Sequence, residues 1–225
     1  MCGRFAVKQS STELAMDLDA VLTDSAPGYP NYNVCPTNQI AVCISVNGTR
    51  RLGGMRWGFI PTSYETPDSG PLIINARSET IVTKATFAQS IRTRRCIIPM
   101  SGYYEWQVDG EARLPHFTYN TDQSLMAVGG IWQMWGSGSQ RKATCAIITV
   151  PSAESMSHLH LRMPLILSKS DWAKWLGEEG HGAATLMKTT QDGDQSFHPV
   201  SDAISSNRAT GPHLMDRRPL DLFGN

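Results

Sequence analysis

A cysteine stands at the second position of the chain, directly after Met1. Because cysteine is small enough to permit removal of an initiator methionine, the sequence predicts a mature chain that begins at Cys2. Such a terminus carries an amine and a thiol on adjacent carbons. The amine adds to an aldehyde to form an imine, and the thiol then closes on the same carbon to form a thiazolidine ring. An α-amino pKa of about 8 leaves a neutral fraction for this reaction at pH 7. Cys2 therefore suggests aldehyde capture, although a cysteine at this position is weak evidence by itself.

The elements that must position this terminus are mostly short strands. The capping box Ser10-Ser11-Thr12-Glu13 predicts a helix whose apolar positions continue to Leu22. A β-branched run over 40–46 ends at Asn47-Gly48 and predicts a hairpin with 50–59. Further strands are expected over 72–74, 96–98, 103–107, 116–119, 125–132, 144–150 and 164–167, and helices over 78–92, 170–176 and 183–190. The pattern predicts an α+β fold, a single domain on a curved, barrel-like antiparallel or mixed β-sheet with flanking helices.

Length and composition narrow the class of protein. The 225 residues suffice for a core without staples, and we expect one domain over 2–215 and a flexible tail over 216–225. No run of 18 apolar residues and no secretory signal occur, so we expect no membrane contact and an intracellular protein. That means cytoplasm or nucleoid in a bacterium and nucleus in a eukaryote. Five cysteines without a CxxC pair argue against a disulfide framework or a zinc site, and we expect no cofactor.

Charge is segregated although the formal net charge is zero. Residues 41–167 carry twelve basic and eight acidic groups, an excess of four positive charges. Such a basic region fits a ligand with a few phosphates better than a long duplex. Scattered, solvated arginines account for the charge equally well.

Seven sequence blocks follow one another in order. They are Cys2-Gly3-Arg4-Phe5, Asn31-Tyr32-Asn33-Val34-Cys35-Pro36-Thr37, Arg56-Trp57-Gly58-Phe59-Ile60-Pro61, Ile74-Asn75-Ala76-Arg77-Ser78-Glu79-Thr80, Arg94-Arg95-Cys96-Ile97-Ile98-Pro99 with Gly102-Tyr103-Tyr104-Glu105-Trp106, His160-Leu161-Arg162-Met163-Pro164 and His198-Pro199-Val200-Ser201. In this order and spacing they resemble the SRAP family, the SOS-response-associated peptidases or abasic-site processing proteins. The resemblance covers about residues 2–205.

The resemblance implies a protein that senses abasic sites in single-stranded DNA. It would trap the ring-opened deoxyribose aldehyde on Cys2 as a covalent thiazolidine crosslink. The crosslink would shield the lesion from strand cleavage and reverse slowly. The implied enzymatic activity is lyase-type, DNA-linking chemistry, with a peptidase activity that removes Met1.

The resemblance also assigns a catalytic set: Cys2 as the nucleophile, with Asn75, Glu105 and His160 around it. An amide at Asn75 could hold the sugar or the new terminus, Glu105 could shuttle protons, and His160 could protonate the sugar ring oxygen. From the residues alone, a turn or helix cap is the commoner interpretation of Asn75, and a solvent-facing strand position is the one ordinarily favoured for Glu105. His158 makes a His-x-His metal site conceivable, but no third ligand is evident, so we expect no metal.

A second group of residues resembles the family's DNA contacts: Arg4, Asn33, Pro36, Trp57, Gly58, Arg77, Trp106, Thr149 and Arg162. The arginines suit phosphates, and Trp57 and Trp106 could stack on bases. Packing in the core explains either tryptophan as well. Two departures concern Leu161, where an acidic residue is common, and the absence of an arginine near Ala85, where Lys84 could substitute.

Two other functions remain compatible with the residues. Cys2 could serve an N-terminal-nucleophile amidohydrolase or peptidase, with its own amine as the base. The tryptophans and arginines could instead form a non-covalent single-strand binding module. In the main interpretation the protein is a monomer whose partner is single-stranded DNA containing abasic sites, with replication-fork proteins as further partners.

Overall fold

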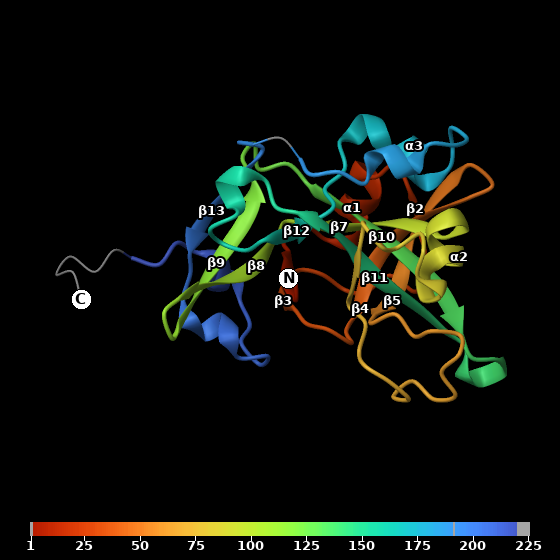
Figure 1. Ribbon diagram of the computed structural model, residues 1–225, viewed down its shortest axis with the longest axis horizontal. Coiled ribbons are helices and arrows are strands. Elements are labelled where there is room, and N and C mark those ends of the chain that lie inside the picture. The colour runs from red at the N-terminus through yellow and green to blue at the C-terminus, as the bar shows by residue number, and fades with distance from the viewer. Residues whose placement is uncertain (1, 191, 220–225) are drawn as a thin grey trace.

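Alternating and β-branched runs of the sequence form two β-sheets, which Figure 1 shows side by side around the N-terminal strand. The structure is a computed structural model that describes residues 2–190 and 192–219. The first sheet is antiparallel. Its strands, in spatial order, are β13 (Gln195–Pro199), β9 (Ala112–Asn120), β8 (Gly102–Asp109), β1 (Arg4–Val7) and β3 (Asn31–Val34).

The second sheet is mixed and ring-like. Its strands, in spatial order, are β12 (Arg162–Pro164), β11 (Lys142–Pro151), β10 (Met126–Trp135), β7 (Arg95–Met100), β4 (Gln39–Val46), β5 (Thr49–Trp57) and β2 (Val21–Leu22), while β6 (Asn75–Arg77) pairs with β11. A short parallel pairing of Thr144 and Cys145 with Arg56 and Trp57 brings β5 back to β11. The sheet therefore curves on itself, which confirms the expected α+β fold with a curved sheet in a single domain.

Helices lie at the margins of the sheets, as expected. They are α1 (Ser11–Asp17), α2 (Ala85–Thr93) and α3 (Trp172–Leu176). Short 3-10 segments are η1 (Gly138–Gln140), η2 (Glu154–Met156), η3 (Lys169–Asp171), η4 (Ala183–Leu186), η5 (Asp202–Ser205) and η6 (Pro212–Met215). None of the helices in the described ranges is long and apolar enough to cross a membrane.

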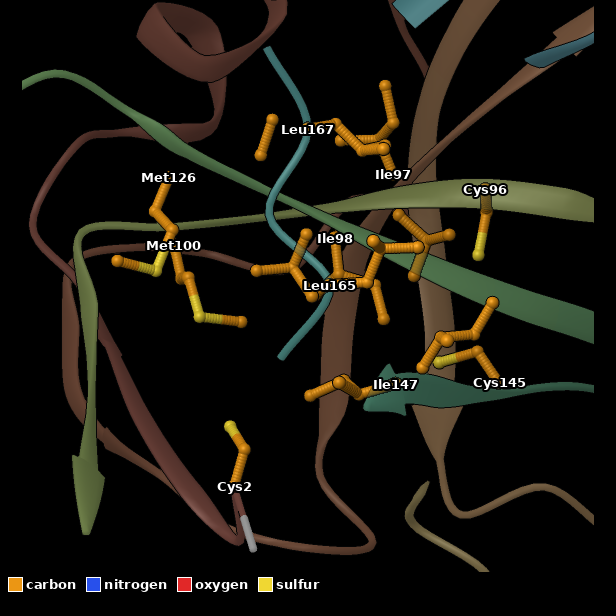
Figure 2. Close-up of a cluster of buried hydrophobic side chains, with 14 of the residues drawn as sticks. Cys2, Cys96, Ile97, Ile98, Met100, Met126, Cys145, Ile147, Leu165 and Leu167 are labelled. Atoms are coloured by element: carbon orange, nitrogen blue, oxygen red, sulfur yellow. The ribbon is translucent and has the colours of Figure 1, made fainter. Parts of the chain in front are cut away.

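The core lies between the sheets and is continuous from the N-terminus to α3. Figure 2 shows part of it, with Cys2 at one end of a cluster that includes Met100, Ile147 and Leu165. Trp175 of α3 is fully buried, and its indole N–H donates to the carbonyl of Cys96 at 2.9 Å. A buried indole N–H needs a hydrogen-bond acceptor of this kind. The bond thus fixes α3 against β7.

Several predicted elements are confirmed and others are wrong in position. The hairpin forms as β4 and β5, with Asn47 and Gly48 at φ of 51° and 76° in the turn. The capping box of Ser10 and Glu13 is present, but α1 ends at Asp17. Val21 and Leu22, which we expected to continue this helix, instead form β2, because Asp19 turns the chain at a φ of 50°.

Four other boundaries differ from the predictions. The strand expected over 72–74 lies at 75–77, and the strand expected over 164–167 lies at 162–164. The helix expected over 78–92 begins at 85, and the one expected over 183–190 is a single 3-10 turn. Residues 216–219 of the predicted tail follow η6, and the backbone N–H of Arg218 donates to the carbonyl of Pro199 at 2.8 Å. Residues 220–225 of that prediction lie outside the described part.

Thr37 adopts a left-handed backbone conformation, with a φ of 74°. Its side chain is exposed, and its backbone N–H donates to the carbonyl of Trp57 at 2.7 Å. A β-branched residue is strained there, by about 1–2 kcal/mol relative to glycine. Glycine loses more backbone entropy on folding, so we expect Thr37→Gly to stabilise the protein by about 0.5–1 kcal/mol. Urea unfolding measures this. Asn47→Gly is the control, because asparagine tolerates its φ of 51°, and a destabilised Thr37→Gly would contradict the prediction.

Candidate active site

Cys2 is fixed at the junction of the two sheets by its own backbone. The side-chain amide of Asn75, at the start of β6, donates from Nδ2 to the carbonyl oxygen of Cys2 at 3.0 Å. The Cys2 side chain is fully buried, and its sulfur points into the core cluster (Figure 2). The strand β6 therefore holds the residue that would carry the reactive terminus, two positions before β1 begins.

Glu105 reaches the same place from β8. Neighbouring residues of a strand point to opposite faces of the sheet. Tyr104 and Trp106 belong to a cluster on one face of the first sheet, under the C-terminal segments, and Glu105 lies on the other face. The predicted alternation is confirmed, and the carboxylate is 5% exposed. It therefore faces the protein interior, and the solvent-facing alternative is wrong.

The thiol of Cys2 and the carboxylate of Glu105 interact electrostatically. Burial raises the pKa of the Cys2 thiol far above its usual range, and the negative charge of Glu105 raises it further. The pKa of the neighbouring Tyr103 is raised by burial first, and also by Cys2 and Glu105. The thiol is thus neutral near pH 7, and a carboxylate lies close enough to affect its proton.

The second polar atom of the Asn75 side chain is its amide oxygen, Oδ1. This oxygen is buried and accepts no hydrogen bond from the residues that the structure describes. A buried amide oxygen without a donor costs free energy, so each such atom calls for an explanation, such as a catalytic role or a bound water or ion. Here Oδ1 belongs to the same amide that holds the carbonyl of Cys2.

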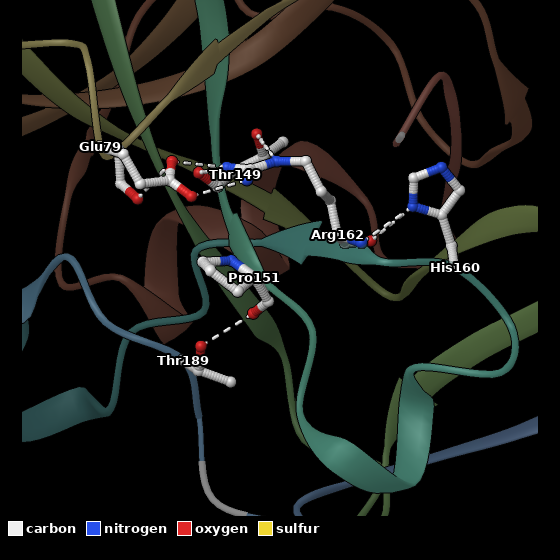
Figure 3. Close-up of polar contacts among 7 residues, drawn as sticks. Glu79, Thr149, Pro151, His160, Arg162 and Thr189 are labelled. Carbon is white, nitrogen blue, oxygen red and sulfur yellow. Dashed lines mark hydrogen bonds and ion pairs between the residues drawn. The ribbon is translucent and has the colours of Figure 1, made fainter.

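His160 is held in one orientation just before β12. The backbone N–H of Arg162 donates to Nδ1 of His160 at 2.9 Å (Figure 3). The carbonyl oxygen of Arg162 also lies 3.2 Å from Nδ1, and the shorter contact, from an N–H that can only donate, favours Nδ1 as the acceptor and Nε2–H in the neutral ring. The backbone of His160 is fixed as well, since the Ser152 hydroxyl donates to its carbonyl at 2.6 Å. The ring can therefore offer a proton from Nε2.

β11 connects the segments that carry Asn75 and His160. It pairs in parallel with β6 over Asn75–Arg77 and antiparallel with β12 over Arg162–Pro164. Thr149 pairs with both strands and is fully buried. Cys2, Asn75 and Glu105 are thus in one place, and His160 is tied to Asn75 through a single intervening strand.

The predicted DNA contacts divide into three groups. Arg77 is exposed on β6, next to Asn75, while Thr149 and Arg162 lie beside it across β11. Pro36 is half-buried in the loop after β3. These residues stay predicted contacts, although the guanidinium of Arg162 already binds protein groups.

A second group of predicted DNA contacts lies on the face of the first sheet that is opposite to Glu105. Arg4 is 9% exposed and donates to Oδ1 of Asn33 at 2.7 Å and to the carbonyl of Ile204 at 2.9 Å. Its guanidinium carbon lies 5.8 Å from the ring centre of Trp106. The side chains of Arg4, Asn33 and Trp106 therefore hold the C-terminal segment against the sheet. Only the backbone of Arg4 contacts Cys2, through a hydrogen bond to its thiol.

The third group is buried. Trp57 is fully buried, packs 5.1 Å from the ring of Phe5 and donates from its indole to the carbonyl of Ile74. It exposes no ring face to a base in this structure, so the packing alternative holds for it. Gly58 has a φ of 139°, and a Cβ there would lie 2.4 Å from Nη1 of Arg56. The backbone conformation at this position therefore requires glycine.

Two other residues, His158 and Glu79, lie on segments next to the site. His158 packs against the ring of Phe197 at 5.2 Å, beside the first sheet. Within the described residues, no group of three or more His, Cys, Asp or Glu side chains is arranged to hold a metal ion. Glu79 forms an ion pair with Arg162 at 2.7 Å. No role for Glu79 follows from the sequence, where its only signal is its place four residues after Asn75.

The sequence matches the family SOS response associated peptidase (SRAP) over residues 1–207. The chain belongs to the SRAP family. The abasic site processing protein YoqW of Bacillus subtilis is 30% identical over 223 residues, covering 96% of this chain and 99% of that protein. The abasic site processing protein HMCES of Xenopus tropicalis is 28% identical over 225 residues, covering 85% of this chain and 67% of that protein.

The fold of this SRAP chain also occurs in solved structures. A crystal structure of a protein from Bacteroides thetaiotaomicron superposes with a TM-score of 0.82 at 22% identity, covering 97% of this chain and 100% of that one. The family membership that the seven blocks indicated is thus confirmed. The two-sheet fold of this chain is shared with that structure.

Proposed function

We propose that this SRAP protein processes abasic sites in single-stranded DNA by forming a covalent crosslink through Cys2 after Met1 is removed. The observation that carries the proposal is the placement of Cys2, whose carbonyl is held by Asn75 and whose thiol pKa responds to Glu105. The relatives YoqW and HMCES are named abasic site processing proteins, which supports an abasic site as the substrate. An abasic site in equilibrium with its open-chain form supplies the aldehyde.

The proposed reaction forms two new bonds to the aldehyde carbon, one from nitrogen and one from sulfur. The α-amine of Cys2 adds to the aldehyde carbon and water leaves, which gives an imine. The thiol sulfur then adds to the same carbon, and its proton ends on the ring nitrogen, so the net reaction releases one water. Because burial keeps the thiol neutral, a base must accept its proton as the C–S bond forms. Glu105 is the candidate for this step.

Asn75 and His160 have complementary roles in this proposal. The Oδ1 of Asn75 would accept a hydrogen bond from the new α-amine, which gives this buried oxygen a donor. The Nε2–H of His160 would donate to the sugar ring oxygen and promote opening to the aldehyde. Arg77, exposed on β6, is the candidate for a nearby phosphate.

The crosslink would protect the strand. An imine at an abasic site promotes β-elimination, which cleaves the backbone, and the thiazolidine removes the imine. Glu105 would also protonate the sulfur in the reverse direction and so permit slow release. Removal of Met1, by this protein or by an aminopeptidase, is a precondition of the reaction because a peptide nitrogen forms no imine.

A denaturing gel tests the proposal. The protein is incubated with single-stranded DNA that carries one abasic site, and we expect a band that survives denaturation. DNA with a tetrahydrofuran analogue, which has no aldehyde, is the matched control and should give none. Intact mass should show the sum of protein without Met1 and DNA, less one water. An amidohydrolase or a non-covalent binder would give no such adduct, and full crosslinking by protein that retains Met1 would exclude the thiazolidine.

A further inference from the structure

An apolar groove lies between α1 and the hairpin of β4 and β5. Its volume is about 550 Å³, and its lining includes Met16 on α1 and both residues of β2, Val21 and Leu22. These three side chains are 76%, 55% and 41% exposed. Exposed apolar side chains that border one groove often mark a surface that binds a partner. The groove is therefore a candidate docking surface.

The strand β2 has one unpaired edge beside this groove. On its other edge it pairs in parallel with β5, Val21 with Arg51 and Leu22 with Leu52. Within the described ranges β2 ends its sheet, and no further strand pairs with it. An unpaired edge presents backbone N–H and C=O groups that an extended peptide can bind. The open edge thus favours an occupant with an extended backbone.

The charged groups around the groove are mainly acidic. Exposed carboxylates on and just after α1 belong to Glu13, Asp17 and Asp19. None of them forms an ion pair with the residues that the structure describes. Arg50 also lines the groove, but its guanidinium is bound to the carboxylate of Glu178 at 2.8 Å. The exposed side chain of Arg51 adds one positive charge. The excess negative charge therefore favours a basic partner.

The acidic character continues on the other side of α1. A second cleft, of about 950 Å³, has Lys169 as the one basic residue of its lining, against the aspartates Asp17, Asp122 and Asp194. Residues 1–40 and 168–225 each carry two more acidic than basic groups, and part of this excess meets here. The helix α1 follows the end of β1 that is opposite to Cys2. A polyanion such as DNA is repelled from this face, while a basic protein segment is attracted.

We propose that the groove beside α1 binds an extended segment of a partner protein that alternates apolar and basic side chains. Successive side chains of an extended segment point to opposite sides. The apolar ones would pack on Met16, Val21 and Leu22, and the lysine or arginine side chains between them would reach the surrounding carboxylates. The inference does not depend on the proposed function. Because α1 and Cys2 lie at opposite ends of β1, the partner would leave Cys2 accessible.

Binding of short labelled peptides to the full chain tests the groove. In fluorescence anisotropy we expect a peptide of alternating valine and lysine to bind. A peptide of alternating valine and glutamate of the same length should bind at least about 10-fold more weakly, because it brings like charges to the carboxylates. Amide NMR shifts caused by the first peptide should lie over 12–22 and 48–50. No binding of the basic peptide, equal affinity of both peptides, or shifts only elsewhere would overturn the proposal.

Met16→Lys is the variant that tests the apolar contact. It replaces an exposed apolar side chain by one that repels the basic peptide, so we expect the Kd to rise at least about 10-fold. Lysine is a good helix former, and thermal unfolding checks that the variant is folded. Val108→Lys is the matched control. Val108 is 67% exposed at the tip of the hairpin of β8 and β9, away from α1 (Figure 1), and its substitution should leave the Kd unchanged.

Two other occupants of the groove are outcomes of the same test. A dimer of the free protein that Met16→Lys dissociates, measured by sedimentation, would assign the groove to a second copy of the chain and overturn the proposal. Affinity for single-stranded DNA with the tetrahydrofuran analogue should change less than about twofold in Met16→Lys, because distant charges are screened. A larger change would assign this face to DNA. None of these measurements uses crosslinking, so a wild type that forms no adduct refutes the proposed function alone.

Discussion

Cys2→Ser is expected to eliminate the denaturation-resistant DNA adduct. Serine keeps the amine, so an imine can still form, but its hydroxyl is a far weaker nucleophile than sulfur for closing the ring. We expect the yield of stable adduct to fall by more than about 10³-fold, the scale on which enzymes lose activity with their nucleophile. The gel assay with abasic single-stranded DNA measures it, and the Met1-free state of the variant is confirmed by intact mass.

Cys35→Ser is the matched control for this substitution. Cys35 is also a free thiol, it is half-buried, and burial raises the pKa of its thiol too. It lies in the loop after β3, where its sulfur contacts the carbonyl of Asn33 at 3.4 Å. It should crosslink as the wild type does. Adducts of Cys2→Ser that appear only after borohydride reduction would show that the amine reacts alone, and undiminished stable adduct would refute the thiazolidine.

The catalytic set could be predicted because its residues stand in family blocks, whereas their arrangement needed the fold. Alternation along 103–107 was enough to place Glu105 opposite Tyr104 and Trp106. No local pattern of the sequence shows that Glu105 and Cys2 lie close together. Their proximity depends on β1 lying between β8 and β3, and β1 is only four residues long. Short strands of this kind are specified by long-range pairing.

Element boundaries failed where a tertiary pairing outweighed a local pattern. Val21 and Leu22 continue the apolar spacing of α1, yet they pair in parallel with Arg51 and Leu52 of β5. The strands β3 and β13 contain polar and aromatic residues without a clear period, so neither was predicted. The hairpin of β4 and β5 was predictable because Asn47-Gly48 specifies the turn locally.

The predicted DNA contacts show what motif transfer cannot supply. Arg4 stands two residues after Cys2, but it shares the face of Ala6 on β1, so its side chain lies on the far face with Asn33. Cys2 precedes the strand, and its side chain lies in the core cluster on the other side. Glu79 stands within one of the sequence blocks, but its partner Arg162 is 83 residues away, so the sequence alone does not show that they pair. The spacing of the motifs identifies residues, and the sheet register decides which of them come into contact.

Loss of stability at alkaline pH is the second large effect we expect. Burial raises the pKa of Cys43 to about 12, and burial raises the pKa values of Cys2, Cys96 and Cys145 well above the usual range. In the unfolded chain these thiols ionise near their ordinary pKa, about 8.5. The unfolded state therefore binds fewer protons than the folded state above that pH, and stability falls as pH rises.

The size of this effect follows from linkage. At pH 9.5 each thiol lowers the free energy of unfolding by about 1.4 kcal/mol, and the four together by about 5–6 kcal/mol. That is a large part of the 5–15 kcal/mol typical of a domain. The loss begins near pH 8.5 and continues until the folded thiols ionise, at about 12 for Cys43. Urea unfolding under reducing conditions at pH 7, 8.5 and 9.5 measures it, and equal stability across this range would contradict it.

The same titration reports on the reactive residue. Cys43→Ala should remove about 1.4 kcal/mol of the loss between pH 7 and 9.5, one thiol's share. Cys2→Ser in the Met1-free protein should remove the same amount if the Cys2 thiol is neutral in the folded state. A smaller share would mean that removing Met1 lets the thiol ionise before DNA arrives. In the neutral case, the thiol reacts only as Glu105 accepts its proton, so its reactivity depends on a carboxylate whose charge also raises its pKa.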